Sequence, residues 1–208
     1  MSARLDSGAV DHTRWVRVPP ADFPDVAAYA RVVAEAHAGP GGAGELAEVL
    51  AYGMERYPRV YPGYGLHFHM EGPRGIPLAV YSAEFDLEGM AGGEADADEE
   101  LRALTHADAD YAVEPPVVEE FGGGRLGTGI RVLRYFVDPD DGADGADGAD
   151  GVDRDDGGNG ITVGLRYAWR VPEHGADVLV LTAAPDPGRV LRAMDDIDAF
   201  ARALRFAP

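Results

Sequence analysis

The chain has 208 residues, 46% of them hydrophobic, which is enough to bury one sizeable core and predicts one domain. It contains no cysteine, which excludes disulfide bonds and thiolate metal sites. The net charge of −19 disfavours nucleic acid and anionic membranes as partners. No stretch approaches the roughly 18 apolar residues of a membrane span, so we expect a cytoplasmic protein that does not insert into membranes.

The amino-terminal quarter predicts a tail and a helix pair. Residues 1–13 are mostly small or polar and predict a disordered tail, followed by a single domain over residues 14–208. A short apolar run at residues 15–18 predicts a strand. Apolar residues at helical spacing predict helices over residues 24–38 and 45–56, joined by a glycine-rich connection. We expect these two helices to form one layer.

Three tyrosines and two prolines follow between Tyr57 and Tyr64. Tyrosine offers a flat apolar ring with a polar tip, so one interpretation is a groove lined with aromatic rings. The other, which we favour, is a connecting loop held in place by its rings.

The segment Leu66–Glu71 has the most suggestive chemistry in the chain. On a strand, His67, His69 and Glu71 project from one face, and two histidines with a carboxylate form a known metal-binding set. Any alternating strand places these positions on one side, however, and no second motif supplies a further ligand. We therefore favour a half-exposed sheet face and expect no metal.

The middle of the chain predicts further strands and a short helix. Residues 76–85 predict a strand and residues 96–106 an acidic short helix. Val117–Phe121 and Leu126–Val137 predict two strands separated by Gly122–Gly124. No Lys-Ser/Thr pair follows these glycines, so a hairpin turn is favoured over a phosphate-binding loop.

Residues 138–160 form a low-complexity stretch of aspartate and glycine. Nine aspartates and one arginine give it a charge of about −8 (nine minus one). Calcium binding is one interpretation, but the spacing of calcium-binding loops is absent. We expect a disordered, solvated loop between two strands.

The last quarter of the chain gives the strongest pattern. Residues 161–171 alternate apolar and small or polar side chains, which predicts a strand with one buried face, and Val178–Leu181 predict a second strand after a turn. Asp186 is a suitable N-cap and Pro187 a suitable first residue for a final helix. The predicted fold class is α+β: an antiparallel sheet flanked by helices, with an amino-terminal helix pair and a carboxy-terminal helix.

Part of the chain, from about Leu126 to Phe206, resembles a known fold group. It is similar to actinobacterial proteins of unassigned function and to the PsbP-like group, which includes the extrinsic photosystem II subunit and the Ran-binding nuclear import factor. The segments that carry the resemblance are Gly129–Val132, Tyr167–Pro172, Leu179–Thr182 and Ile197–Leu204. The resemblance implies an antiparallel sheet with helices on both faces, used for binding or assembly and not usually for catalysis.

The sequence favours a non-catalytic function. No nucleophile–base constellation is recognisable, so we expect no catalytic residue and no cofactor, although an enzyme is not excluded. The leading hypothesis is a protein-binding module of assembly or chaperone type, with secretion as one setting, whose partner is another protein. The alternatives are a small-molecule carrier with a pocket lined by Tyr57, Tyr61, Tyr64 and Trp169, and a metal-dependent enzyme using His67, His69 and Glu71.

Arginines on two neighbouring strands are the candidate binding residues. If the odd-numbered residues from 161 to 171 face the final helix, Arg166 and Arg170 lie on the other face of that strand. The preceding strand adds Arg131 or Arg134, depending on the register. Such a cluster would be a positive site in an acidic chain, suited to an interface. The alternative is that these arginines pair internally with the abundant carboxylates.

Overall fold

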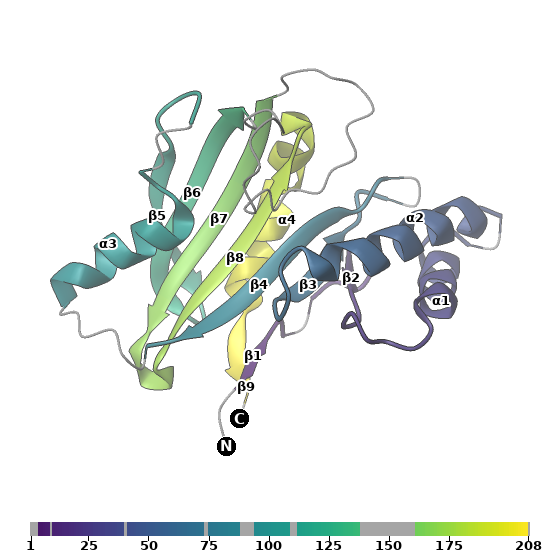
Figure 1. The fold of residues 1–208 in the computed structure, drawn as a ribbon, viewed down its shortest axis with the longest axis horizontal. Coiled ribbons are helices and arrows are strands. Elements are labelled where there is room, and N and C mark those ends of the chain that lie inside the picture. The colour runs from purple at the N-terminus through teal and green to yellow at the C-terminus, as the bar shows by residue number, and fades with distance from the viewer. Residues whose placement is uncertain are drawn as a thin grey trace. The chain divides into compact units, whose positions relative to one another are not determined.

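A computed structural model shows how these segments fold (Figure 1). It describes residues 4–8, 10–39, 41–72, 75–87, 94–108, 112–137 and 161–207. Helices and antiparallel strands contribute comparably, so the fold class is α+β, as predicted. The predicted loop at residues 138–160 lies outside the described residues.

The chain divides into two compact units. Of the residues that the structure describes, those within 4–10, 82–137 and 161–207 belong to unit 1, and those within 11–81 belong to unit 2. The boundary falls within one strand, so that strand contributes residues to both units. The single domain over residues 14–208 stays a prediction.

Unit 1 is built on an antiparallel sheet whose strands follow each other in space in the order β4-β8-β7-β6-β5. Their bounds are β4 (Leu78–Asp86), β5 (Val117–Gly124), β6 (Gly127–Val137), β7 (Ile161–Val171) and β8 (Ala176–Ala184). The short helix η2 (Pro172–His174) joins β7 to β8. The register pairs Val171 with Ala176 across this turn, and Ile161 with Val137 on the other side of β7. The predicted strand at 161–171 and the hairpin after it are therefore confirmed.

Helices cover both faces of this sheet (Figure 1). The final helix α4 (Pro187–Ala203) begins at the predicted N-cap, where Asp186 accepts a hydrogen bond from the Gly188 amide at 2.9 Å. It covers the face that carries the odd-numbered residues of β7. Helix α3 (Glu94–Thr105) contacts β6 and β7 on the face that carries the even-numbered residues. As a result, β7 is buried on both sides.

The core beneath α4 contains large aromatic rings that require a glycine on the neighbouring strand. The Tyr167 and Trp169 rings stack with their centroids 6.0 Å apart, and Phe121 of β5 contacts both edge-on. A Cβ atom on Gly129 would lie 2.6 Å from Cδ1 of Trp169 and 2.2 Å from the Ala168 carbonyl oxygen. Gly129 thus makes room for the indole ring.

The chain termini form a sheet of their own, in a stretch where the sequence predicts a disordered tail. Strand β1 (Arg4–Asp6) pairs antiparallel with β9 (Arg205–Ala207), and Asp6 forms an ion pair with Arg205 at 3.2 Å. The Leu5 amide also donates to the Glu84 carboxylate at 2.9 Å. A three-residue strand has almost no periodicity, and its partner lies at the other end of the sequence. Residues 4–6 therefore depart from the predicted tail.

The β5–β6 hairpin is confirmed, but its turn lies later than predicted. Strand β5 continues through Gly122–Gly124, and Gly124 pairs with Gly127. The register shifts between Phe121 and Gly124, so the three glycines form an irregular strand end. The turn itself is at Arg125 and Leu126.

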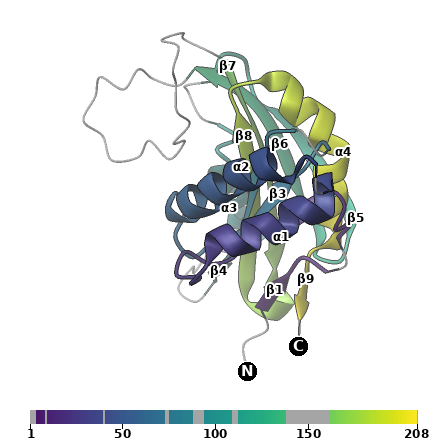
Figure 2. The ribbon, with the colours of Figure 1, turned by 90° about the vertical axis from the view of Figure 1, so that its right-hand side faces the viewer.

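Unit 2 combines a helix pair with strands in the order β2-β3-β4. Its elements are β2 (Trp15–Arg17), α1 (Val26–Ala38), α2 (Ala43–Arg56), η1 (Tyr57–Arg59), β3 (Gly65–His69) and the first residues of β4. Figure 2 shows α1 and α2 side by side, which confirms the predicted helix pair. Helix α1 begins two residues after the predicted start because Asp25 is its N-cap.

Helix α2 packs closely on β3. Its buried stripe includes Leu46, Leu50 and Met54. Gly53 belongs to the same side, and a Cβ atom there would come within 3.0 Å of the Phe68 ring. The opposite side of α2 is therefore the solvent-facing one.

Replacing Gly129 with alanine should destabilise the protein by roughly 1–3 kcal/mol or more, because the new methyl group cannot be accommodated without moving Trp169 or β7. Gly44→Ala is the matched control. It lies in α2 with no atom near the new Cβ, and should stabilise by about 0.5–1 kcal/mol through helix propensity. Urea unfolding measures both. Equal stabilities for Gly129→Ala and the wild type would contradict the packing described.

Candidate functional site

The sheet register decides between Arg131 and Arg134, the two alternatives for the third member of the predicted arginine cluster. Arg131 is paired with Tyr167 and lies on the α4 face, whereas Arg134 is paired with Gly164 and lies on the α3 face with Arg166 and Arg170. Arg134, Arg166 and Arg170 therefore share one face of the sheet, and Arg131 lies on the other. Their individual contacts show what each does.

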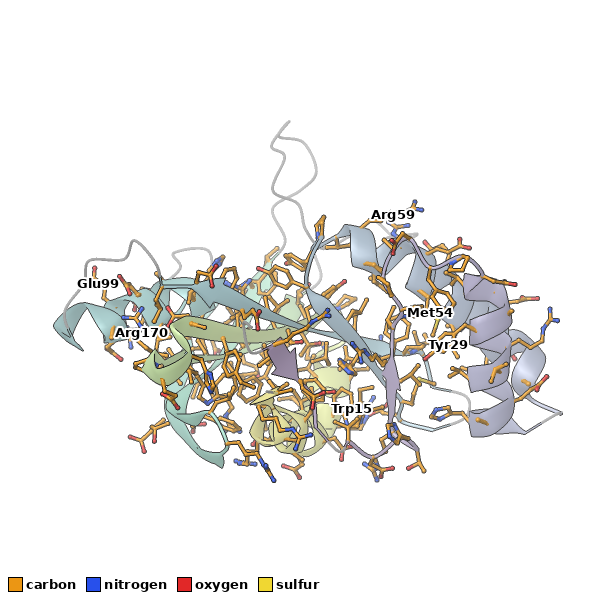
Figure 3. The ribbon with its side chains drawn as sticks, turned by 90° about the horizontal axis from the view of Figure 1, so that it is seen from below. Trp15, Tyr29, Met54, Arg59, Glu99 and Arg170 are labelled. Carbon is orange, nitrogen blue, oxygen red and sulfur yellow. The ribbon has the colours of Figure 1, made fainter. Side chains whose placement is uncertain are left out.

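Arg170 is held by two carboxylates within unit 1. Its Nε and one terminal nitrogen donate to the two oxygens of Asp177, at 2.9 and 2.8 Å, and the same terminal nitrogen also contacts Glu100 of α3. The Asp177 side chain is fully buried. These hydrogen bonds, first to Asp177 and then to Glu100, raise the pKa of Arg170. Arg170 thus connects β7, β8 and α3 (Figure 3).

Arg131 belongs to a second network, beneath α4. It donates to Asp198 at 2.8 Å and contacts Glu119 of β5, and the Tyr167 hydroxyl donates to the same Asp198 at 2.6 Å. Burial lowers the pKa of Arg131, but the hydrogen bonds to Glu119 and Asp198 outweigh it and raise the pKa. Burial, and then the bond to Asp198, raise the pKa of Tyr167. This network fixes α4 on the sheet.

The remaining two arginines lie near the end of α3. Arg166 donates to the Leu104 carbonyl oxygen at 3.3 Å, in the last turn of α3, where positive charge complements the helix dipole. Arg134 is buried, with its guanidinium carbon 4.7 Å from the centre of the Phe136 ring. His106 follows α3 in a left-handed conformation, with φ 52°. Burial, followed by the charges of Arg166 and Arg134, lowers the pKa of His106 to about 4.

The alternative metal set does not assemble. His67 and His69 lie on one face of β3 as predicted, but both are buried, and the Trp15 ring lies 5.0 Å from that of His69. Glu71 lies beyond the end of β3 and is exposed. In the part of the chain that the structure describes, no three such side chains are placed to hold a metal ion. The predicted face is also buried and not half-exposed.

The tyrosines of the predicted carrier pocket contact each other. Tyr61 stacks on Tyr64 with ring centroids 5.1 Å apart and meets Tyr81 edge-on at 4.9 Å, and the Tyr81 hydroxyl donates to the Tyr57 carbonyl. Trp169 packs in unit 1 against Tyr167 and Phe121. These contacts support the interpretation of a loop held by its rings.

The candidate site that the structure does indicate lies on the outer side of α2 and on η1. Val49 and Tyr52 are 38% and 51% exposed, which is high for an apolar and an aromatic side chain. Arg56 and Arg59 continue the same row, since these four positions are three, four and three residues apart and therefore share one helix face. We call these four residues the α2 outer stripe.

An open hollow lies at the end of the α2 outer stripe. It is lined by Tyr52, Glu55, Arg56, Arg59 and Val60. The Arg56 guanidinium donates to the Tyr52 hydroxyl at 2.6 Å and lies 5.8 Å from the centre of its ring, so these two side chains hold each other in place.

Arg59 differs from the four predicted arginines because its charge faces solvent. It forms no hydrogen bond or ion pair through its side chain with any residue that the structure describes. Figure 3 shows Arg59 directed away from unit 2, whereas Met54 lies on the inner side of α2. The helical spacing of this row is readable in the sequence, but Val49 also fits the spacing of the apolar stripe of α2, which predicts that it is buried.

Comparison of the chain with protein-family models, curated proteins and solved structures finds no match. The resemblance to the PsbP-like group therefore stays a prediction. Among the described residues, the helices are too short or too polar to cross a membrane.

Arg170→Ala should destabilise the protein by about 3–5 kcal/mol, because it leaves the buried Asp177 carboxylate without its cation. Adding Asp177→Ala should recover part of this loss. Arg125→Ala, at an exposed arginine without described partners, should change stability by less than about 0.5 kcal/mol. The measurement is chemical denaturation. A loss below about 1 kcal/mol for Arg170→Ala would instead show a solvated arginine, available for binding.

His106 should titrate below its ordinary pKa of 6.5, toward about 4. The unfolded chain then binds this proton at higher pH than the folded protein. The contribution of His106 to stability is therefore fully present above pH 6.5 and is lost as the pH falls toward 4. Neighbouring protein atoms desolvate the His106 ring in part, but the residue keeps contact with solvent, so solvent screens part of the effect and the measured pKa should lie between these limits.

NMR titration of the imidazole measures this pKa directly. Arg166→Gln should raise it, because a neighbouring positive charge is removed, whereas Arg189→Gln on α4 should not. An unchanged pKa in Arg166→Gln would show that the arginine charge does not act on His106.

Proposed function

We propose that the protein is a non-catalytic protein-binding module, of assembly or chaperone type, and that the α2 outer stripe is its docking surface. The observation that carries this proposal is the row of Val49, Tyr52, Arg56 and Arg59 on the solvent side of a helix whose other side is buried. The resemblance to a fold group of binding and assembly proteins is consistent with this function. Cytoplasmic location and a setting in secretion stay predictions.

The composition of the α2 outer stripe suits an interface. Tyrosine and arginine are enriched among residues that dominate binding energy, because each combines a large contact area with hydrogen-bonding capacity. Burying the exposed parts of Val49 and Tyr52 removes apolar area from water, which favours association. Because Tyr52 and Arg56 already hold each other, less side-chain freedom is lost on binding.

The lining of the hollow includes two arginines and one glutamate, Glu55, so positive charge is in excess there and favours an acidic group on the partner. Arg59 is placed to bind a carboxylate in two-point contact, and the hollow beside Tyr52 and Val60 accepts an apolar or aromatic side chain. The chain as a whole carries a charge of −19 and repels strongly acidic proteins. We therefore expect a neutral or basic protein that presents one acidic residue beside an apolar one.

Affinity capture from native cells with matched variants tests the proposal. Arg59→Glu and Tyr52→Ala should each lose the partner, while Arg31→Glu, an exposed arginine on α1, should keep it. With the purified partner, calorimetry should show affinities lower by about tenfold or more for the first two variants. All three should fold with nearly wild-type stability, because these side chains are exposed.

The proposal fails if every captured protein is retained equally by Arg59→Glu, Tyr52→Ala and the wild type. It also fails if native mass spectrometry shows a stoichiometric metal or small molecule bound to the purified protein, because such a ligand would favour the enzyme or carrier hypothesis.

A further inference from the structure

A second surface is formed by the edge of the unit 1 sheet, at β5. In the strand order of the sheet, β5 is the last strand, and its neighbour on the inner side is β6. Figures 1 and 2 show β5 at the margin of the sheet of unit 1. In β5, residues 117–121 are in continuous register with β6, and no other described residue forms a backbone hydrogen bond with them. Their outward backbone groups are thus a template for a further strand.

The ends of β5 limit this template to a short window. Pro115 and Pro116 precede the strand and lack backbone donors. At the other end the register shifts after Phe121, where the three glycines begin. About five residues can therefore pair, which matches a short linear motif and disfavours extended aggregation.

The side chains of residues 117–121 determine which peptide sequence can pair with this part of β5. Val117 and Val118 are followed by Glu119 and Glu120, and the two members of each pair lie on opposite faces of the sheet. Glu119 forms an ion pair with Arg131, which also binds Asp198, and its side chain stays half-exposed. Glu120 is exposed and forms no ion pair with any described residue.

A second copy of the chain is disfavoured as the added strand. Antiparallel pairing of β5 with itself, centred on this window, places Glu119 and Glu120 of one copy near those of the other, and like charges across strands are unfavourable. The chain charge of −19 adds to this repulsion. Basic side chains opposite the two glutamates instead complement the window.

We propose that β5 binds an extended segment of another protein by strand addition, with apolar residues opposite Val117 and Val118 and basic residues opposite Glu119 and Glu120. This surface differs from the α2 outer stripe, and the inference does not rest on the function proposed above. Backbone hydrogen bonds supply the affinity, and the basic residues set the register and direction.

The probe is the peptide Thr-Arg-Arg-Val-Val-Thr, acetylated and amidated, added to the full chain. Read antiparallel to β5, it places its arginines opposite Glu120 and Glu119. At millimolar peptide, amide resonances of residues 117–121 should shift and their hydrogen exchange should slow. A peptide methylated on its backbone nitrogens should bind at least about tenfold more weakly, since the strand donors are lost.

Charge variants separate strand addition from general attraction to an acidic protein. Glu120→Lys should lower the affinity for this peptide about fivefold. A peptide with glutamate in place of its first arginine, which lies opposite residue 120, should recover the affinity for this variant. Glu114→Lys makes the same charge change before the strand and should alter the affinity by less than about twofold. Neither glutamate forms an ion pair with any described residue, so both variants should fold.

Several results would overturn this inference. One is the absence of shifts in β5 at millimolar peptide. Another is equal binding of the methylated peptide, which would show that backbone pairing is not involved. Equal losses in Glu114→Lys and Glu120→Lys would show non-specific attraction, and β5 amides protected by dimerisation would assign the edge to a second copy.

Discussion

The burial of β7 on both faces is the constraint on which unit 1 depends. A strand covered by α4 on one side and α3 on the other has to satisfy every polar group it carries, because an unpaired charge in the interior costs several kcal/mol. Its odd-numbered residues meet this condition through apolar packing and the Tyr167–Asp198 hydrogen bond. On the other face Arg170 requires Asp177 and Glu100. Both helices are thus attached to the sheet by charges as well as by apolar contact.

This constraint also explains why the candidate function moves away from the predicted arginines. Arg131 and Arg170 each bind two carboxylates within the fold and have little hydrogen-bonding capacity left for a partner. Removing either arginine would leave a buried carboxylate without its positive partner. Arg59 lies in η1, which has no buried residue, and its guanidinium does not neutralise a buried carboxylate of any described strand. Charge available for recognition is therefore found outside the sheet interior.

The parts of the fold that could be predicted from the sequence are those with a long, regular pattern. Strand β7 and helix α4 each offer more than ten residues of clear periodicity and, for α4, an N-cap at Asp186. Strand β1 offers three residues, and its partner β9 is about two hundred residues away, so no local pattern reveals it. The faces of Arg131 and Arg134 depend on the β6–β7 register, which is set across a connection of more than twenty residues that carries no register information.

The candidate site was harder to predict for a different reason. Apolar spacing reports which side of a helix is buried, and in α2 it groups Val49 with the buried Leu46, Leu50 and Met54, whereas the structure leaves Val49 exposed on the α2 outer stripe. Its signal is compositional: valine, tyrosine and two arginines in a row where glutamates would be ordinary.

Local composition also matters more for partner selection than the net charge of the chain. About eight of the nineteen excess negative charges lie at residues 138–160, and at physiological salt a charge acts over only about 8 Å. We therefore propose that each surface selects its partner by the few side chains it presents, Arg59 a carboxylate and Glu120 a basic residue, on the same acidic protein.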